Sequence, residues 1–368
     1  MSKQILVATR KGLFTLERAG GQRWEIAKSD FVGDNVSYAL ADPRDGWRYA
    51  ALEHGHFGCK LHRAAGPDGV WEECAVPVYP KQPEGEVDKD QMGRTIAWNL
   101  VKLWAIEPGG ASEPGTLWTG TLPGGLFRST DRGTSWELMH ALWDHPSRKF
   151  WMGGGYDVPG IHSIAVDPRD AGTVRVGVST GGVWITRDNG ASWEICGKGM
   201  RADWVPPEVE YEPNAQDVHR LAQSAEPDEF WVQHHNGIFR STDACASWTE
   251  IKQAGPSRFG FAAAAHPKQP GTAWFVPAIK DERRIPVDAR MVVTRTRDGG
   301  ATFEVLSRGL PQTHAYHLVY RHGLAIDDTG DCLAMGSTTG GLWTTNDGGD
   351  SWRTVSQDLP PIHSVRFA

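Results

Sequence analysis

Short apolar segments recur along the chain, each followed by a polar turn and then by a second short segment led by an aromatic residue. Copies of the first segment read KGLFTLE from Lys11, GGLFRST from Gly124, GGVWITR from Gly181, NGIFRST from Asn236 and GGLWTTN from Gly340. Apolar and polar residues alternate within short runs that glycines bound, which is typical of β-strands. No stretch has the spacing of a long amphipathic helix, so the pattern predicts an all-β chain.

The polar turn has the form Ser/Thr-x-Asp-x-Gly-x-Ser/Thr-Trp/Phe. Its acidic residues are Asp131, Asp188, Asp243, Asp298 and Asp347, and its aromatic residues are Trp136, Trp193, Trp248, Phe303 and Trp352. Trp24 and Trp71 mark two weaker copies upstream. Seven repeats of about 50 residues predict one domain, 1–368, folded as a seven-bladed β-propeller of four-stranded antiparallel blades. The expected blades are 362–368 with 1–28, 35–74, 95–139, 161–196, 217–251, 259–306 and 317–355.

The two ends of the chain are predicted to share one blade. The N-terminal segment supplies only three strands, and the C-terminal PPIHSVRFA matches PGIHSIAVD at the start of an inner strand. We therefore expect Ile362–Ala368 to form the missing innermost strand, which removes open sheet edges.

Each polar turn is interpreted as a hairpin connection whose Asp accepts backbone N–H bonds and whose Gly adopts a positive φ. Cys245 stands where the other copies have Gly, so that turn is expected to be strained or differently bent. The aromatic residue should pack between neighbouring blades. This favours a structural role for these Asp residues over a catalytic one.

These residues resemble the Asp-box, or BNR, repeat of sialidases, sortilin-type receptors and photosystem II assembly factors. The resemblance covers essentially the whole chain. It implies the propeller fold and places the Asp boxes on the face away from the active site, but this repeat hosts many functions.

Composition narrows the functional classes. A net charge of -7, a pI near 6.1 and the absence of a Lys/Arg run argue against a nucleic-acid partner. No apolar segment is long enough to span a membrane, and no signal peptide is expected before the first strand. The cysteines are scattered and odd in number, which favours reduced thiols and a cytoplasmic location; they are Cys59, Cys74, Cys196, Cys245 and Cys332.

Strand order predicts which loops share a face. Asp-Pro-type turns and Asp boxes should lie at the bottom of the propeller, and the remaining loops at the top. The longest segments belong to the top: 75–94, 140–160, 197–217, 278–290 and 307–317. Long irregular loops in a compact domain are usually functional, so we expect the ligand there.

Histidines concentrate on the predicted top face. A divalent metal held by imidazoles from different blades is one interpretation, because neutral His is a common ligand of transition metals. The alternative is that these histidines hydrogen-bond to neighbouring backbone at strand starts. The candidate ligands are His162, His219, His234, His235, His317 and His363.

Charged and aromatic residues of the top loops add candidates for chemistry. The candidate catalytic residues are His162, His219, Tyr156, Asp157, Arg201 and Asp203. A glycosidase-type carboxylate pair is conceivable among Asp157, Asp203, Glu208 and Glu210. Arg284-Ile285-Pro286 matches the Arg-Ile-Pro motif of sialidases, whose Arg grips a carboxylate, although here it lies in a blade-six insertion.

Three functions remain open. The first is a polar, carbohydrate- or carboxylate-like ligand in a His-rich central pocket, acted on by a hydrolase or lyase with or without a metal. The second is a scaffold that grips a partner protein with exposed Trp143, Trp151 and Trp204. The third is a sialidase-like glycoside hydrolase, disfavoured because sialidase propellers have six blades.

Overall fold

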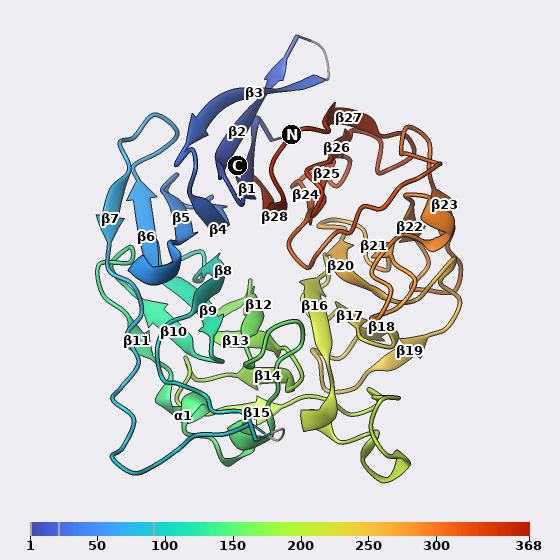
Figure 1. Ribbon diagram of the computed structural model, residues 1–368. Coiled ribbons are helices and arrows are strands. Elements are labelled where there is room, and N and C mark those ends of the chain that lie inside the picture. The colour runs from blue at the N-terminus through green and yellow to red at the C-terminus, as the bar shows by residue number, and fades with distance from the viewer. Residues whose placement is uncertain (1, 21–22, 91–92) are drawn as a thin grey trace.

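The computed structural model describes residues 2–20, 23–90 and 93–368, and in it seven four-stranded antiparallel sheets form a closed ring (Figure 1). This confirms the predicted fold class. Met1, residues 21–22 of the first predicted blade and residues 91–92 of the predicted loop 75–94 lie outside the described residues.

The first four blades follow the chain from its N-terminus. Blade one consists of β28 (Ile362–Phe367), β1 (Gln4–Thr9), β2 (Gly12–Ala19) and β3 (Arg23–Asp30), and blade two of β4 (Asn35–Ala41), β5 (Arg48–Glu53), β6 (Cys59–Ala64) and β7 (Glu72–Cys74). Blade three consists of β8 (Lys102–Pro108), β9 (Leu117–Leu122), β10 (Leu126–Ser129) and β11 (Glu137–Leu138), and blade four of β12 (Ile161–Asp167), β13 (Asp170–Val178), β14 (Gly182–Thr186) and β15 (Glu194–Ile195).

The remaining three blades complete the ring. Blade five consists of β16 (Val218–Gln223), β17 (Phe230–His234), β18 (Gly237–Ser241) and β19 (Thr249–Ile251), and blade six of β20 (Gly260–Ala265), β21 (Ala273–Pro277), β22 (Val293–Thr296) and β23 (Glu304–Leu306). Blade seven consists of β24 (Leu324–Ile326), β25 (Leu333–Gly336), β26 (Leu342–Thr345) and β27 (Arg353–Ser356).

Helices are confined to the connections. They are α1 (His140–Trp143) and the 3-10 turns η1 (Gly55–Phe57), η2 (Pro146–Phe150), η3 (Pro207–Val209), η4 (Pro213–Ala215) and η5 (Val287–Ala289). In the described part of the chain, none of them has the length and apolar character that crossing a membrane requires.

Burial decreases from the axis outward. Every residue of the innermost strand β20 and of β9, the second strand of its blade, is buried, because the strands near the axis pack against neighbouring blades on both faces. The outermost β7, with the sequence EEC, is mostly exposed. Four of the six residues of β20 are alanine, and such small side chains suit the narrow end of a wedge-shaped blade.

The C-terminal strand closes the ring as predicted. β28 lies innermost in the first blade and pairs antiparallel with β1, with Val365 opposite Val7. Ile362 and Val365 are buried in the cluster that joins this blade to the last one. Figure 1 shows the two termini side by side in that blade.

The five polar turns have the hydrogen bonds expected of them. In the first, Asp131 Oδ1 accepts from the Ser135 backbone N–H at 2.9 Å and Asp131 Oδ2 accepts from Ser135 Oγ at 2.6 Å. The other four copies repeat both bonds. Cys245 adopts φ 76, the left-handed conformation that glycine supplies elsewhere, so its turn keeps the same bend at some conformational cost.

Six inner strands carry a register shift of the β-bulge type close to their first residue. An extra residue at such a shift turns its side chain away from the regular alternation. The residues at the shifts are Ser37, Trp104, His162, His219, Phe261 and His363. They stand around the axis at the top face, the end of the ring at which inner strands begin.

Candidate functional site

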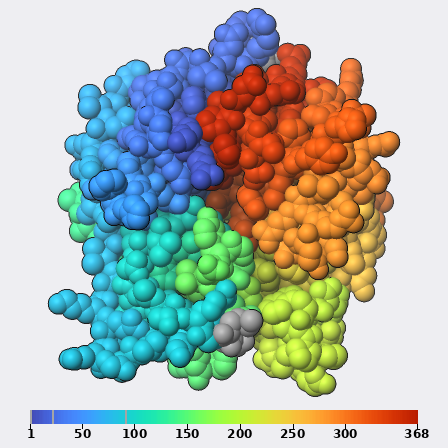
Figure 2. Space-filling view, in the orientation of Figure 1, coloured from blue at the N-terminus to red at the C-terminus, as the bar shows by residue number. Residues whose placement is uncertain are grey.

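Two pockets adjoin one another on the top face. The arginine pocket, of about 260 Å³, is lined by Ser37, Lys102, Trp104, Gly155, Tyr156, Arg284, Tyr320, Arg321, His322 and His363. The histidine pocket, of about 340 Å³, is lined by Arg94, Met152, Gly153, Gly154, Gly155, Thr180, Trp204, Asp217, His219, His235, Phe261, Asp281 and Arg284. Gly155 and Arg284 form their common wall. Figure 2 shows one face of the ring hollowed near its centre.

The arginine pocket is lined by cations and phenols. Lys102 is paired with Glu53, and Arg284 Nη2 lies 2.5 Å from Asp281 Oδ1. Arg321 is buried, and within the described ranges it has no ion-pair partner. Its Nη2 donates to the Gly154 carbonyl at 2.7 Å, while its Nε has no hydrogen-bond partner. Burial lowers the pKa of Arg321 to about 10, so it remains charged at neutral pH.

Aromatic rings form the walls of this pocket. Tyr156 meets Trp104 edge to face with centroids 5.1 Å apart, and Lys102 Nζ lies 5.4 Å from the Tyr156 ring centre. Arg321 lies over Trp104 at 5.0 Å and over Phe261 at 5.5 Å. These contacts hold the Arg321 guanidinium in place without neutralising its charge.

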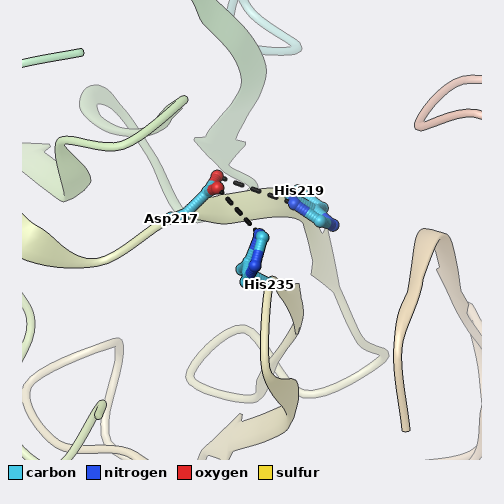
Figure 3. Close-up of side chains that lie close together, drawn as sticks. All are labelled: Asp217, His219 and His235. Carbon is cyan, nitrogen blue, oxygen red and sulfur yellow. Dashed lines mark ion pairs between the residues drawn. The ribbon is translucent and has the colours of Figure 1, made fainter. Parts of the chain in front are cut away.

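Asp217, His219 and His235 meet in the histidine pocket (Figure 3). Asp217 Oδ2 lies 3.2 Å from His235 Nδ1, and Asp217 Oδ1 lies 3.7 Å from His219 Nε2. Among the described residues, this is the one group of at least three His, Cys, Asp or Glu whose candidate ligand atoms all lie within 4.8 Å of one another. Either a proton or a metal cation can occupy the space between the carboxylate and an imidazole.

The charges of this group follow from burial and from the pairing. The two imidazoles hold the pKa of Asp217 well below its usual range, against the opposing effect of burial. Burial lowers the pKa of His219, whereas the Asp217 carboxylate outweighs burial at the more exposed His235 and raises its pKa. At neutral pH Asp217 is therefore an anion and His219 is neutral.

The structure does not bring the six predicted histidine ligands together. His162 is completely buried, with Nδ1 bonded to Ser163 Oγ at 2.9 Å and Nε2 to the Val218 carbonyl at 2.7 Å. Nε2 thus joins β12 to β16, as in the backbone-bracing alternative, while Nδ1 is used within β12. His322 Nε2 in turn bonds the His162 carbonyl at 2.7 Å.

The other three histidines lie apart from the group. His234 is buried against Phe239, and its Nδ1 accepts from the Asn236 N–H. His317 packs on Trp343 and bonds Thr339. His363 lines the arginine pocket, where its Nε2 lies 2.8 Å from Asn35 Oδ1. Of the six histidines expected from several blades, only His219 and His235 therefore lie in one group, together with Asp217.

The predicted catalytic acids and Arg201 lie outside both pockets. The Asp157 side chain is 99% exposed, 3.7 Å from Arg94. Arg201 lies 3.8 Å from Asp203 and 3.9 Å from Glu210, in the loop before β16. Glu208 lies in the exposed turn η3. Of the predicted catalytic residues, Tyr156 lines the arginine pocket and His219 the histidine pocket.

Two of the three tryptophans proposed as a partner-protein surface are buried. Trp143 is 1% exposed and Trp151 is completely buried, because the segment 140–160 turns both side chains inward, into the hydrophobic clusters of blades three and four. Trp204 alone is exposed, at 40%. The flat aromatic surface expected of the scaffold hypothesis is not formed by these three residues.

Sequence reasoning missed Asp217 and Arg321, the two buried charges on which the pockets depend. Asp217 directly precedes β16, and His235 directly follows β17. Because Val218 pairs with His234, residue 217 stands opposite residue 235. The sequence therefore contained a signal for this group: Asp217-x-His219 at the start of one predicted strand, and His235 at the end of the strand that pairs with it. Arg321 carried no comparable signal.

Comparison with known proteins agrees with the fold, and no family model matches the chain. A curated oligoxyloglucan-reducing end-specific xyloglucanase of Emericella nidulans is 25% identical over 290 residues, covering 78% of this chain and 30% of that protein. The chain thus spans about a third of the length of this relative.

Solved structures give a similar result. The GH74 xyloglucanase from Xanthomonas campestris superposes with a TM-score of 0.68 at 17% identity, over 97% of this chain and 53% of that one. A structure of YCF48 bound to D1 peptide superposes with a TM-score of 0.50 at 13% identity, over 88% of this chain and 86% of that one. At these identities the two structures support the propeller fold alone.

Proposed function

We propose that the protein is a glycoside-hydrolase-like propeller that binds a carboxylate-bearing sugar, with the carboxylate in the arginine pocket. One observation carries the proposal: Arg321 is a buried guanidinium that lines the pocket with no carboxylate in ion-pair contact, and the Asp217 carboxylate acts on it only at longer range. Leaving a buried charge unpaired is costly, and an anionic ligand would compensate it.

The other lining residues suit the same ligand. Arg284 and Lys102 add positive charge on either side, each already shared with one acid. Trp104, Tyr156 and Tyr320 supply aromatic surface and hydroxyl groups, which are suited to the faces and hydroxyls of a sugar ring. The adjoining histidine pocket gives room for the rest of a larger ligand.

Sequence comparison supports the carbohydrate part of the proposal. The curated relative is named as a xyloglucanase, although this chain spans only 30% of it. We also assign the five polar turns to the Asp-box repeat, on the hydrogen bonds they share. Arg284, which the Arg-Ile-Pro resemblance singled out as a carboxylate ligand, lines the arginine pocket.

Binding of simple sugars tests the proposal. Calorimetry or saturation-transfer NMR with D-glucuronate and D-galacturonate should detect binding at least tenfold tighter than with D-glucose and D-galactose. Arg321→Met should weaken uronate binding at least tenfold, because it removes the charge while keeping most of the volume. Arg187→Met is the matched control, since Arg187 is exposed and pairs with Glu194 outside the pocket.

The thermal stability of Arg321→Met separates a binding role from a structural one. A buried, unpaired charge kept for a ligand should be dispensable for folding, so the variant should unfold at the same or a higher temperature than the wild type. Equal binding of uronates and neutral sugars would contradict the proposal. Unchanged uronate affinity in Arg321→Met would contradict it as well.

A further inference from the structure

The register of one hairpin brings three potential metal ligands together. The His235 N–H donates to the Asp217 carbonyl at 2.9 Å, directly above the Val218–His234 pair. His219, two residues after Asp217, occupies the register shift of β16, and its ring stacks on Phe261 with centroids 4.5 Å apart. His235 is held edge to face against Phe259 at 5.8 Å.

Blade geometry does not require these residue types. The same backbone bond recurs in other blades, from Ser179 to Gly160, from Ala278 to Phe259 and from Arg10 to Pro361, each at 2.9 Å. Pairs such as glycine with serine or phenylalanine with alanine make the bond equally well. The Asp and His side chains of blade five are therefore additions to the repeat rather than part of its structural pattern.

The tautomer of His219 leaves a lone pair facing the carboxylate. His219 Nδ1 lies 2.6 Å from the Gly260 carbonyl, which can only accept a hydrogen bond, so Nδ1 carries the proton. Nε2 then presents its lone pair to Asp217 Oδ1 at 3.7 Å. Asp217 is 7% exposed, and its Oδ1 has no hydrogen-bond partner. Two electron-rich atoms thus face one another in a buried place, and a cation between them would satisfy both.

The spacing suits a transition-metal ion. Bonds of about 2.0–2.2 Å place tetrahedral ligand atoms about 3.3–3.6 Å apart. The observed separations are 3.2 Å from Asp217 Oδ2 to His235 Nδ1 and 3.7 Å from Asp217 Oδ1 to His219 Nε2, and the candidate ligand atoms of the three residues all lie within 4.8 Å of one another. A rotation of the carboxylate and small shifts of the imidazoles would bring them into this range. A ligating histidine usually donates its other ring N–H to a backbone carbonyl or a carboxylate, as His219 does to Gly260.

The site is open on one side. All three residues line the histidine pocket, which leaves further coordination positions for water or ligand. Gly154 forms the opposite wall, where an added Cβ would lie 2.8 Å from Asp217 Oδ1, so its lack of a side chain keeps this position clear. Two imidazoles and one carboxylate suit zinc- and iron-like divalent ions better than Mg²⁺ or Ca²⁺, which prefer oxygen ligands alone.

We infer that Asp217, His219 and His235 form a mononuclear site for a divalent transition-metal ion, with its open positions facing the histidine pocket. Such an ion could activate a water molecule or polarise a bound oxygen. The inference does not depend on the proposed sugar ligand, because metal binding can be measured without it.

Titration of tag-free, chelator-treated protein with Zn²⁺ tests the inference, with Co²⁺ as a spectroscopic probe of the ligand set. One ion per chain should bind, and Asp217→Asn and His235→Ala should each weaken Zn²⁺ binding at least tenfold. Asp217→Asn keeps the shape of a buried side chain, and His235→Ala changes a partly exposed one, so at least one variant should retain its fold by circular dichroism. His317→Ala, on the same face but outside the group, is the matched control.

Failure of this inference can be told apart from failure of the sugar proposal. Arg321→Met should not weaken Zn²⁺ binding, whatever it does to uronates. Absence of saturable one-to-one Zn²⁺ binding would overturn the metal site and indicate a plain Asp217–His235 ion pair. Wild-type Zn²⁺ affinity in both Asp217→Asn and His235→Ala, or an equal loss in His317→Ala, would overturn it too.

Discussion

Trp248 offers a quantitative test of how the blades are held together. Its indole is 5% exposed and packs in the cluster that joins blades four and five, with Val183, Met200 and Cys245. Its Nε1 donates to the Cys196 carbonyl of the preceding blade at 3.2 Å. Truncation of a buried Trp to Ala costs about 3–5 kcal/mol, so Trp248→Ala should lower the free energy of unfolding by that amount.

Trp248→Phe separates the contribution of the indole N–H and its extra apolar area from that of the remaining aromatic ring. Phe303 occupies the equivalent place in the next blade, so the position accommodates a phenyl ring. The substitution removes the indole N–H and some apolar area, which should cost about 1–2 kcal/mol. The free energy of unfolding is measured by urea titration followed by circular dichroism. A loss below about 1 kcal/mol for Trp248→Ala, or equal losses for both variants, would refute the role of the indole in holding blades four and five together.

Two further predictions concern the polar turns and their acids. Asp131→Ala should lower the free energy of unfolding by about 1–2 kcal/mol, because the Ser135 N–H and hydroxyl lose their acceptor at a largely exposed site. Urea titration measures this change. A loss of uronate or Zn²⁺ affinity at unchanged stability would contradict the structural role of Asp131. The pKa of Asp188 and of Asp298 is lowered to about 2 by bonds from Ser192 and Thr302, so the stability they give is present above about pH 4 and is lost as the pH falls towards 2. Urea titrations between pH 2 and 6 should show this slope and a shallower one in Asp188→Asn, whereas an identical slope would count against it.

The fold could be predicted because its signals are local and repeated. Each polar turn carries its own hydrogen-bonding residues, and the aromatic residue after it marks one blade. The closure by Ile362–Phe367 followed from a missing strand and a matching terminal segment. These inferences need only the alternation of side chains and the chemistry of turns.

The pockets could be predicted only in part, because bulges change where side chains point. Counting from the turns predicts that His162 and His219 share a strand face but stand two residues apart, whereas in the structure both occupy a register shift near the start of their strands. Each histidine bonds a backbone carbonyl of the next blade with one nitrogen, His162 that of Val218 and His219 that of Gly260. They differ in the other nitrogen, which bonds Ser163 Oγ in His162 and faces Asp217 in His219. The difference depends on the residues that flank each histidine, which the alternation of apolar and polar positions does not reveal.

Hairpin register is the principle that would have found the buried carboxylate. In a propeller blade, the residue before the inner strand stands opposite the residue after the second strand, and in blade five these are Asp217 and His235. Reading each predicted hairpin across its strands, rather than along them, pairs these two residues directly. His219 joins them from the same strand, two residues after Asp217, where its Nε2 lies 3.7 Å from Asp217 Oδ1. Side chains that meet within one hairpin can therefore be predicted from the pairing of two strands alone. Histidines that meet from several blades can be predicted only if the orientation of every blade about the axis is known.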